Sequence, residues 1–413
     1  MRLAAIDRQL AWVALALMAC GFIVLYSAGQ TDVPTAGAGV WRRQFIWFGV
    51  GLAAAWAAFQ TSPRLLEWLT PAIYGFSLVL LIIVLAVGTG AGTAAGSHSW
   101  LAIGSVRIGQ PSELAKVATV LMLARYLSSR REPPRSLRDL VAPALIVGIP
   151  FLLVLKQPDL GSALVFVGVF FAMMFWCGVR PRLLFMIASP GISLLLAFSN
   201  VTWAFWIIGF TAVLFYWRPY VLDGLTFWLL NVASGTVAMP LWHRLAPYQQ
   251  NRLLTFLNPE VDPRAAGYHA IQSRVAIGSG GWLGTGYTEG PQKRLAFLPE
   301  QHTDFVFSVV GEELGFVGVA IALTLFMALL LILVRIARRA TDSFSSLMIF
   351  GIVGILFSHV FENVGMTVNL MPITGIPLPF FSYGGSFFII CCLCLGLAFR
   401  VAWDSRLAGY ADV

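Results

Sequence analysis

Charged side chains are scarce in this sequence. Of its 413 residues, 11% are Asp, Glu, Lys or Arg and 58% are hydrophobic, and the mean hydropathy is +0.81. A soluble domain carries about 25% charged residues and no more than about half apolar ones. The shortage excludes a water-soluble enzyme, a disordered chain and a collagen-like chain. Because the apolar runs are longer than the ~10 residues of a membrane-barrel strand, the predicted fold is all-α, a polytopic membrane protein.

Cysteine is also scarce, with five residues among the 413. All five cysteines lie inside apolar runs, so no disulfide or zinc-binding pattern can be read from them. We expect no cleaved signal peptide, because the first apolar run, residues 9–29, is too long and lacks a small-x-small site after it. The net charge of +8 is interpreted as a determinant of membrane orientation, and nothing in the sequence supports nucleic-acid binding.

About twelve membrane-spanning helices are predicted from the apolar runs. Several of them are short and two joins are tight, so ten or eleven spans is the alternative. The predicted spans are residues 9–29, 44–60, 71–89, 113–127, 140–156, 160–178, 183–199, 201–217, 225–242, 305–334, 345–369 and 381–402.

The loop charges predict the orientation of these spans. Lys and Arg accumulate in cytoplasmic loops, and with a cytoplasmic N-terminus every predicted cytoplasmic loop contains Arg. The short outer loops at 157–159, 200 and 370–380 contain neither Lys nor Arg, while Arg42 and Arg43 are an exception. We therefore expect both termini in the cytoplasm.

Two segments on the predicted outer face are longer than the other connections. They are residues 90–112 and a large extracytoplasmic loop, residues 243–304. Long connections are usually functional or disordered, and the aromatic and apolar residues of 243–304 argue against disorder. We expect this loop to fold back onto the membrane face and to carry function, within a single membrane domain spanning 1–413.

The densest polar string of the large loop ends just before a predicted helix. Thr303 or Asp304 could cap that helix by accepting hydrogen bonds from its first free N–H groups. Capping leaves the neighbouring Glu300, Gln301 and His302 unexplained. A carboxylate at this membrane boundary could instead act as a general base.

Ionisable residues also occur inside predicted spans. Glu113 and Lys116 share one face of an otherwise apolar helix, and such residues usually face a cavity or a partner. A purely structural ion pair is the alternative. Trp100, just before them, could be an interfacial aromatic residue. Glu312 and Glu313 could bind a cation, conduct protons or pack against Arg or Lys.

Two further segments have irregular backbone. Residues 258–273 contain Asn-Pro and Asp-Pro steps, which are typical of turns, and a short helix is expected at Ala270–Ile277. The glycines that follow this helix predict a flexible flap, a loop that binds an anion, or a plain turn-rich loop. Residues 370–386 hold three prolines before Ser-Tyr-Gly-Gly-Ser, which predicts a broken or re-entrant segment beside a cavity. Glu362 and Asn363 are expected to line that cavity.

These residues alone favour an enzyme acting on a lipid-linked polar substrate, or a transporter of one. Four long motifs then resemble the SEDS family (shape, elongation, division, sporulation), and the resemblance covers most of the chain. They are Gly267-Tyr-His-Ala-Ile-Gln-Ser273, Phe297-Leu-Pro-Glu-Gln-His-Thr-Asp-Phe305, Gln110-Pro-Ser-Glu-Leu-Ala-Lys116 and Pro377-Leu-Pro-Phe-Phe-Ser-Tyr-Gly-Gly-Ser386. Asn363-Val-Gly-Met366 and Thr374-Gly-Ile-Pro-Leu-Pro379 are similar to the elongation (RodA-like) branch rather than the division (FtsW-like) branch.

The resemblance implies a peptidoglycan glycosyltransferase for cell elongation and shape. Such an enzyme polymerises lipid II at the outer face of the bacterial cytoplasmic membrane and releases undecaprenyl diphosphate. It also implies a class B penicillin-binding protein transpeptidase and other elongation-complex membrane proteins as partners. A divalent cation, Mg or Mn, is the cofactor candidate, the metal site is unassigned, and no organic cofactor is expected.

The family's essential acidic residue falls on Asp304, which would be the general base, with Asp262 as the second candidate. The resemblance also implies a substrate-binding set around it. This set is Trp100, Arg107, Glu113, Lys116, Gln301, His302, Thr303, Ser382, Tyr383 and Ser386.

Two departures from the family pattern stand out. Ser99 occupies the position where the family usually has Arg, so we expect a phosphate contact to move to Arg107. The family commonly has ten spans, whereas residues 182–242 hold an extra helix pair, for which a partner or stability role is expected. A lipid II flippase and a noncatalytic scaffold for the penicillin-binding protein are the rival functions.

Overall fold

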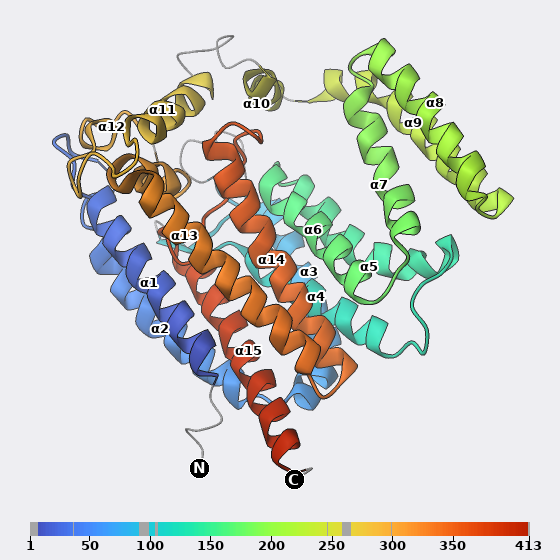
Figure 1. The fold of residues 1–413 in the computed structure, drawn as a ribbon, viewed down its shortest axis with the longest axis horizontal. Helices are drawn as coiled ribbons and strands as arrows, with labels where there is room; N and C mark the ends of the chain where they lie inside the picture. Colours follow the sequence, from blue (N-terminus) through green and yellow to red (C-terminus); the bar gives the residue numbers. More distant parts are fainter. Residues whose placement is uncertain are drawn as a thin grey trace.

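A helix covers every predicted span in the computed structural model of the chain (Figure 1). The structure describes residues 7–35, 37–90, 99–103, 106–245, 247–257, 266–298 and 300–411. The helices over the spans are α1 (Arg8–Ala28), α2 (Val40–Gln60), α3 (Pro63–Val87), α4 (Pro111–Ser128), α5 (Leu137–Leu155), α6 (Leu160–Trp176), α7 (Pro181–Leu196), α8 (Asn200–Trp217), α9 (Val221–Arg244), α13 (Val306–Arg339), α14 (Ser343–Thr367) and α15 (Gly385–Ala411).

The number of membrane crossings remains a prediction. Within the described ranges, eight helices are long and apolar enough to cross a bilayer, and α6 and α7 are shorter apolar helices. The helix α3 begins at Pro63, eight residues earlier than predicted, because Ser62 accepts a hydrogen bond from the N–H of Leu65 and caps it. Pro71, expected to begin the span, lies inside the helix.

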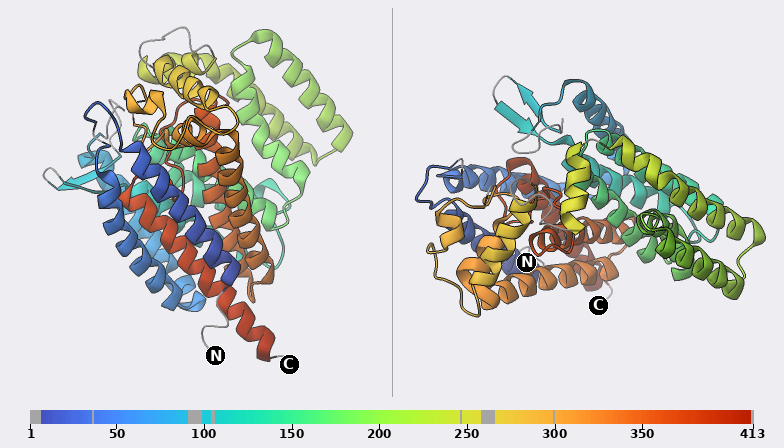
Figure 2. Two further views of the ribbon diagram at one scale, coloured as in Figure 1. Left: turned by 60° about the vertical axis from the view of Figure 1, so that its left-hand side comes forward. Right: turned by 90° about the horizontal axis from the view of Figure 1, so that it is seen from above.

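The centre of the bundle is formed by α4, α6, α13, α14 and α15, with α1 and α2 along one side (Figures 1 and 2). The helices α14 and α15 are the most buried of the candidate spans. Both termini lie at one end of the bundle. The outer segments α10 (Pro247–Leu257), α11 (Ala266–Ser279) and α12 (Pro291–Arg294) cover the opposite end (Figure 1).

The 90–112 segment contains a short hairpin, so the all-α fold has one small exception. In the described part of the chain, β1 (Leu101–Ile103) pairs antiparallel with β2 (Val106–Gly109). The hairpin leads directly into α4. The described parts of residues 243–304 form helices and ordered turns, which agrees with the argument against disorder. That the loop folds back onto the membrane face stays a prediction.

Residues 182–242 form a unit at the edge of the bundle, built from α7, α8 and α9 (Figure 2). Its small apolar core consists of Met186, Phe210 and Phe227. The side chain of Asn231 joins all three helices. Its Nδ2 donates to Ser189 Oγ (2.7 Å), and its Oδ1 accepts an indole N–H from α8 (2.9 Å). Such interhelical hydrogen bonds stabilise helix packing where lipid supplies no hydrophobic driving force.

The glycine-rich stretch after α11 packs against an interruption in α13. Gly315 has φ 60° and ψ −159°, which breaks the helix. The freed N–H groups of Phe316 and Val317 donate to the carbonyls of Gly281 (2.9 Å) and Trp282 (3.1 Å). A helix break at membrane depth is tolerated when its backbone groups find partners in this way. The stretch is therefore an ordered, turn-rich packing element, which agrees with the interpretation as a turn-rich loop. The flap and anion-cradle interpretations stay predictions.

Candidate active site

Asp304 lies in a tight turn directly before α13. Glu300 has φ 51°, and its carbonyl oxygen accepts the N–H groups of Thr303 and Asp304, both at 3.1 Å. The N-cap residue of α13 is Phe305, which has no capping side chain. The hydroxyl of Thr303 donates to the Glu300 carbonyl at 3.2 Å, so the capping prediction for Thr303 was wrong. Asp304 itself is half-buried.

The backbone of this turn is held by the proline-broken segment 370–386. Asn363 Nδ2 donates to the carbonyl oxygen of Asp304 (2.8 Å) and to that of Ile376 (2.7 Å). The hydroxyl of Ser382 donates to the carbonyl of Thr303, and the N–H of Tyr383 donates to the carbonyl of His302 (2.8 Å). These contacts fix the turn from α14 on one side and from the approach to α15 on the other.

The segment 370–386 is non-helical up to α15, as its prolines predicted, and residues 378–382 within it are buried. The N–H of Leu378 donates to Ser382 Oγ at 2.7 Å, which ties the segment to itself. Gly375 has φ +72°, and a Cβ at this position would lie 3.3 Å from Asp304 Oδ2. Only glycine adopts this backbone without strain while leaving the carboxylate its space.

Two further predicted residues lie around the turn. Gln301 is buried, and its Nε2 donates to the carbonyl of Ala28 at 2.9 Å, so it joins the turn to the end of α1. His302 lies beside Tyr383, with ring centroids 6.1 Å apart. Partial burial lowers the pKa of His302 and the nearby Glu300 carboxylate opposes this, so the net shift is downward and the ring is neutral at neutral pH.

A second polar cluster is buried between α4 and α14. Lys116 Nζ donates to Glu113 Oε1 (2.8 Å) and lies 2.8 Å from His359 Nε2. All three residues are at most 2% exposed. A lysine ammonium can only donate, so His359 Nε2 is the acceptor and the proton of the neutral ring is on Nδ1. His359 Nδ1 then donates to the carbonyl of Pro377 at 3.1 Å.

Pro377 and Ile376 join the two clusters. The carbonyl of Pro377 contacts His359 of the buried cluster, and the carbonyl of its neighbour Ile376 contacts Asn363, which holds Asp304. The sequence did not single out His359. Its signal was a histidine inside an otherwise apolar span, four residues before Asn363 on the same helix face.

Glu362, expected to line a cavity, is buried in α14 beside this cluster. Its Oε2 has no hydrogen-bond partner among the described residues. Buried carboxylate oxygens normally have partners. That Glu362 lines a cavity stays a prediction.

The first outer segment reaches the same region from the other side. Trp100 pairs with Thr89 in an antiparallel bridge, and a Cβ at Gly109 would contact the Ser386 side chain at 3.4 Å. Gln110 Nε2 donates to Asp159 Oδ2 (2.7 Å). The side chain of Arg107 and all of Asp262 lie outside the described residues.

The carboxylates of α13 have a packing role. Lys293 Nζ lies 2.6 Å from Glu313 Oε1 and donates to Ser27 Oγ at 3.0 Å. Glu312 accepts the N–H groups of Gln292 (2.6 Å) and Lys293 (3.2 Å) at the start of α12. These contacts attach the large loop to α13 and α1. Of the open interpretations for Glu312 and Glu313, packing against a lysine is the one observed.

No metal-ligand set can be assigned in the part of the chain that the structure describes. Its His, Cys, Asp and Glu side chains form no group of three or more that could hold a metal ion. A half-buried carboxylate on a rigid turn, at the end of the bundle covered by the large loop, can accept a proton from a bound hydroxyl.

Comparison with protein families gives a match to the FtsW, RodA and SpoVE cell cycle protein model over residues 8–220 and 202–407. Among curated proteins, the chain is 36% identical to the peptidoglycan glycosyltransferase MrdB of Escherichia coli over 400 residues, covering 96% of this chain and 93% of that protein. It is 33% identical to the peptidoglycan glycosyltransferase RodA of Treponema pallidum, covering 96% and 97%.

Solved structures give similar matches. One match is a chain from a solved peptidoglycan synthase complex that coordinates polymerization and crosslinking. It aligns with a TM-score of 0.71 and 32% identity, over 97% of this chain and 98% of the other. The rod shape determining protein RodA of Thermus thermophilus aligns with a TM-score of 0.62 and 30% identity, over 97% of each chain.

Proposed function

Because this chain belongs to the FtsW, RodA and SpoVE family of cell cycle proteins and is RodA-like within it, we propose that it is a peptidoglycan glycosyltransferase. It polymerises lipid II into glycan strands for cell elongation and shape. It is a multi-pass membrane protein, and we place its site at the outer face of the bacterial cytoplasmic membrane, with both termini in the cytoplasm.

The proposed chemistry rests on one observation, that hydrogen bonds fix the backbone of the turn that bears Asp304. Its turn is hydrogen-bonded to Asn363, Ser382 and Tyr383, so the carboxylate is positioned before substrate arrives. Such preorganisation is what general-base catalysis requires of a side chain. Asp262 is retained as the alternative base.

The reaction proposed is a single displacement. The 4-hydroxyl oxygen of an acceptor N-acetylglucosamine attacks the anomeric carbon of N-acetylmuramic acid on the donor lipid. The new C–O bond forms as the bond to undecaprenyl diphosphate breaks, and Asp304 takes the hydroxyl proton. Attack opposite the leaving group inverts the configuration at that carbon.

The leaving diphosphate needs cationic partners. Lys293 and Arg294 are already paired, with Glu313 (2.6 Å) and Asp32 (3.0 Å) respectively, and Lys116 is paired with Glu113. We assign the diphosphate contact to Arg107, which lies in strand β2 of the hairpin that leads into α4, or to a Mg or Mn ion.

The partner proposed for this activity is a class B penicillin-binding protein transpeptidase, which crosslinks the glycan product. The similarity to a solved peptidoglycan synthase complex supports this partner. Other membrane proteins of the elongation complex are expected to bind as well.

The test is glycan-strand formation from lipid II by the purified full-length chain, with and without a class B partner and a divalent cation. Asp304→Ala and Asp262→Ala, the variants of the two candidate bases, are assayed beside wild type. We expect strands from wild type and Asp262→Ala and none from Asp304→Ala. No strands from wild type under any condition would favour the flippase, which transport into vesicles would then test. Equal strands from wild type and Asp304→Ala would reject Asp304 as the base.

A further inference from the structure

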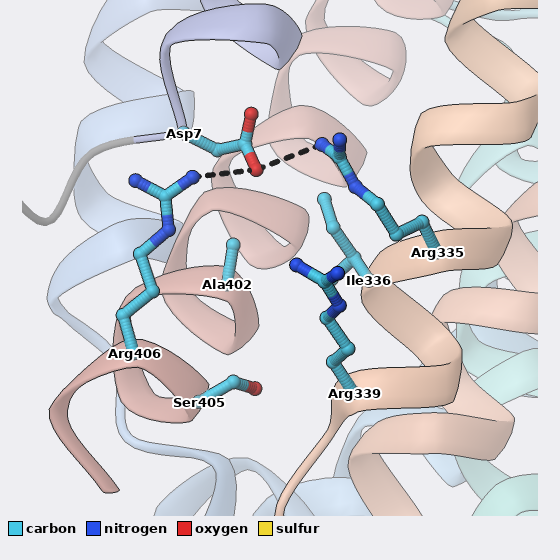
Figure 3. A pocket seen from close by; sticks show the side chains of 7 residues that line it. All are labelled: Asp7, Arg335, Ile336, Arg339, Ala402, Ser405 and Arg406. Atoms are coloured by element: carbon cyan, nitrogen blue, oxygen red, sulfur yellow. Dashed lines mark hydrogen bonds and ion pairs between the residues drawn. The ribbon is translucent and has the colours of Figure 1, made fainter. Parts of the chain in front are cut away.

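A cavity of about 330 Å³ opens between the start of α1 and the ends of α13 and α15 (Figure 3). It lies at the opposite end of α13 from Asp304. Three helices contribute to it. Asp7 precedes α1, Arg335 and Arg339 lie in the last two turns of α13, and Arg406 lies near the end of α15. The cavity has no part in the chemistry proposed above, and its lining carries more positive than negative charge.

Asp7 holds two of these arginines in place. One oxygen, Oδ2, accepts a guanidinium N–H from Arg335 (3.0 Å) and another from Arg406 (2.9 Å), while Oδ1 accepts the N–H of Leu10 as the cap of α1. The Asp7 side chain is only 6% exposed, whereas those of Arg335 and Arg406 are about one-third exposed. The arginines are therefore anchored at the buried carboxylate and still reach the cavity (Figure 3).

Arg339 completes the ring of guanidinium groups. It lies one turn beyond Arg335 on α13 and lines the same cavity. Arg339 is exposed, and the described residues provide it with no carboxylate within ion-pair distance. Figure 3 shows its guanidinium pointing into the space between α13 and α15, beside Ile336 and opposite Ala402. Three planar guanidinium groups converging on one space match the geometry of a phosphate anion.

We propose that this cavity binds a phosphate group, with Arg339 as its principal ligand and with Arg335 and Arg406 contributing N–H groups held ready by Asp7. The bound anion would join the ends of α1, α13 and α15. The phosphate could be the headgroup of an anionic lipid, since on the predicted topology this end faces the anionic cytoplasmic leaflet. It could equally be a soluble phosphate, and the chemistry of recognition is the same.

The test uses the purified full-length chain in an uncharged detergent and follows its unfolding temperature. One arm titrates sodium phosphate against sodium chloride at equal ionic strength. The other arm compares mixed micelles of phosphatidylglycerol with micelles of phosphatidylcholine. Arg339→Gln is the test variant. Arg338→Gln is the matched control, because it removes the same charge from an exposed neighbour that does not line the cavity.

Ligand that binds only the folded state raises the unfolding temperature. We expect phosphate or phosphatidylglycerol to stabilise wild type and Arg338→Gln, and Arg339→Gln to weaken the apparent affinity at least about tenfold. Stabilisation by phosphatidylglycerol alone would identify a lipid site, and stabilisation by inorganic phosphate would identify a soluble ligand. No stabilisation of wild type in either arm, or equal loss in the two variants, would overturn the proposal.

Discussion

Asn363 uses the two hydrogens of its side-chain amide to join the carbonyl of Asp304 (2.8 Å) to the carbonyl of Ile376 (2.7 Å). Asn363 is fully buried in α14, so both carbonyls depend on it inside the protein. The residue thus connects the turn that bears the proposed base to the proline-broken segment facing it. Replacing it should disturb that turn more than the rest of the fold.

We predict that Asn363→Ala lowers polymerisation at least about tenfold. The variant leaves the buried carbonyl of Ile376 without this partner, at a cost of about 1–3 kcal/mol, and also releases the part-buried carbonyl of Asp304. A shift of 1.4 kcal/mol in the barrier is about tenfold in rate. Asn231→Ala is the matched control, because Asn231 is equally buried and also donates two hydrogen bonds, but in the α7–α9 unit. Both variants should unfold at lower temperature. Equal activity loss in both would contradict a specific role for Asn363.

Gly375→Ala should impair activity through the space it takes from Asp304. The position has φ +72°, which costs an L-residue about 1–2 kcal/mol, and the new Cβ would lie 3.3 Å from Asp304 Oδ2. Gly39→Ala carries the same backbone strain at φ +73°, with no atom within 4 Å of its Cβ. Strand formation by the two variants separates strain from crowding. If Gly39→Ala is as inactive as Gly375→Ala, crowding of the carboxylate is not the cause.

Variants of the buried Glu113–Lys116 pair test whether the pair has a structural or a functional role. Lys116→Met leaves Glu113 unpaired at 3% side-chain exposure, and breaking a buried pair typically costs about 3–5 kcal/mol. Adding Glu113→Leu removes the stranded charge and should restore most of the unfolding temperature. Because Lys116 also contacts His359, which holds Pro377, we expect the double variant to remain poorly active. Full recovery of activity would reduce the pair to a structural element.

His302 should give the protein a measurable pH dependence of stability. Burial lowers its pKa below the usual value of about 6.5. Below that value the unfolded chain binds the proton more readily than the folded one, so stability falls as the pH drops from about 6.5 toward the lowered pKa. His302→Gln should flatten this part of the curve of unfolding temperature against pH. An unchanged slope would show that other groups cause the acid sensitivity.

The sequence predicted the helices well because each membrane helix can be recognised from its own run of apolar residues. Each apolar run carries its own signal, and the error at α3 arose where Pro71 was taken as a boundary although Ser62 and Pro63 begin the helix upstream. The polar residues in the spans were equally visible, since Glu113 and Lys116 stand out against apolar neighbours.

The contacts between those residues could not be predicted in the same way. Lys116 and His359 are separated by 243 positions, and only helix packing brings their nitrogens to 2.8 Å. Glu312 and Glu313 were ambiguous because their partners, the backbone of α12 and Lys293, come from a loop whose path depends on the break at Gly315. Asp262 lies outside the described residues, so the choice between the two candidate bases rests on experiment.

The most direct test of the account separates binding from turnover in Asp304→Asn. This variant keeps the size of the side chain and removes its capacity to take a proton. We predict that the affinity for lipid II stays near that of wild type while the rate of glycosidic bond formation, measured in a single turnover, falls about 10²–10⁴-fold. A variant that binds lipid II and forms the bond at the wild-type rate would contradict the assignment of Asp304 as the general base.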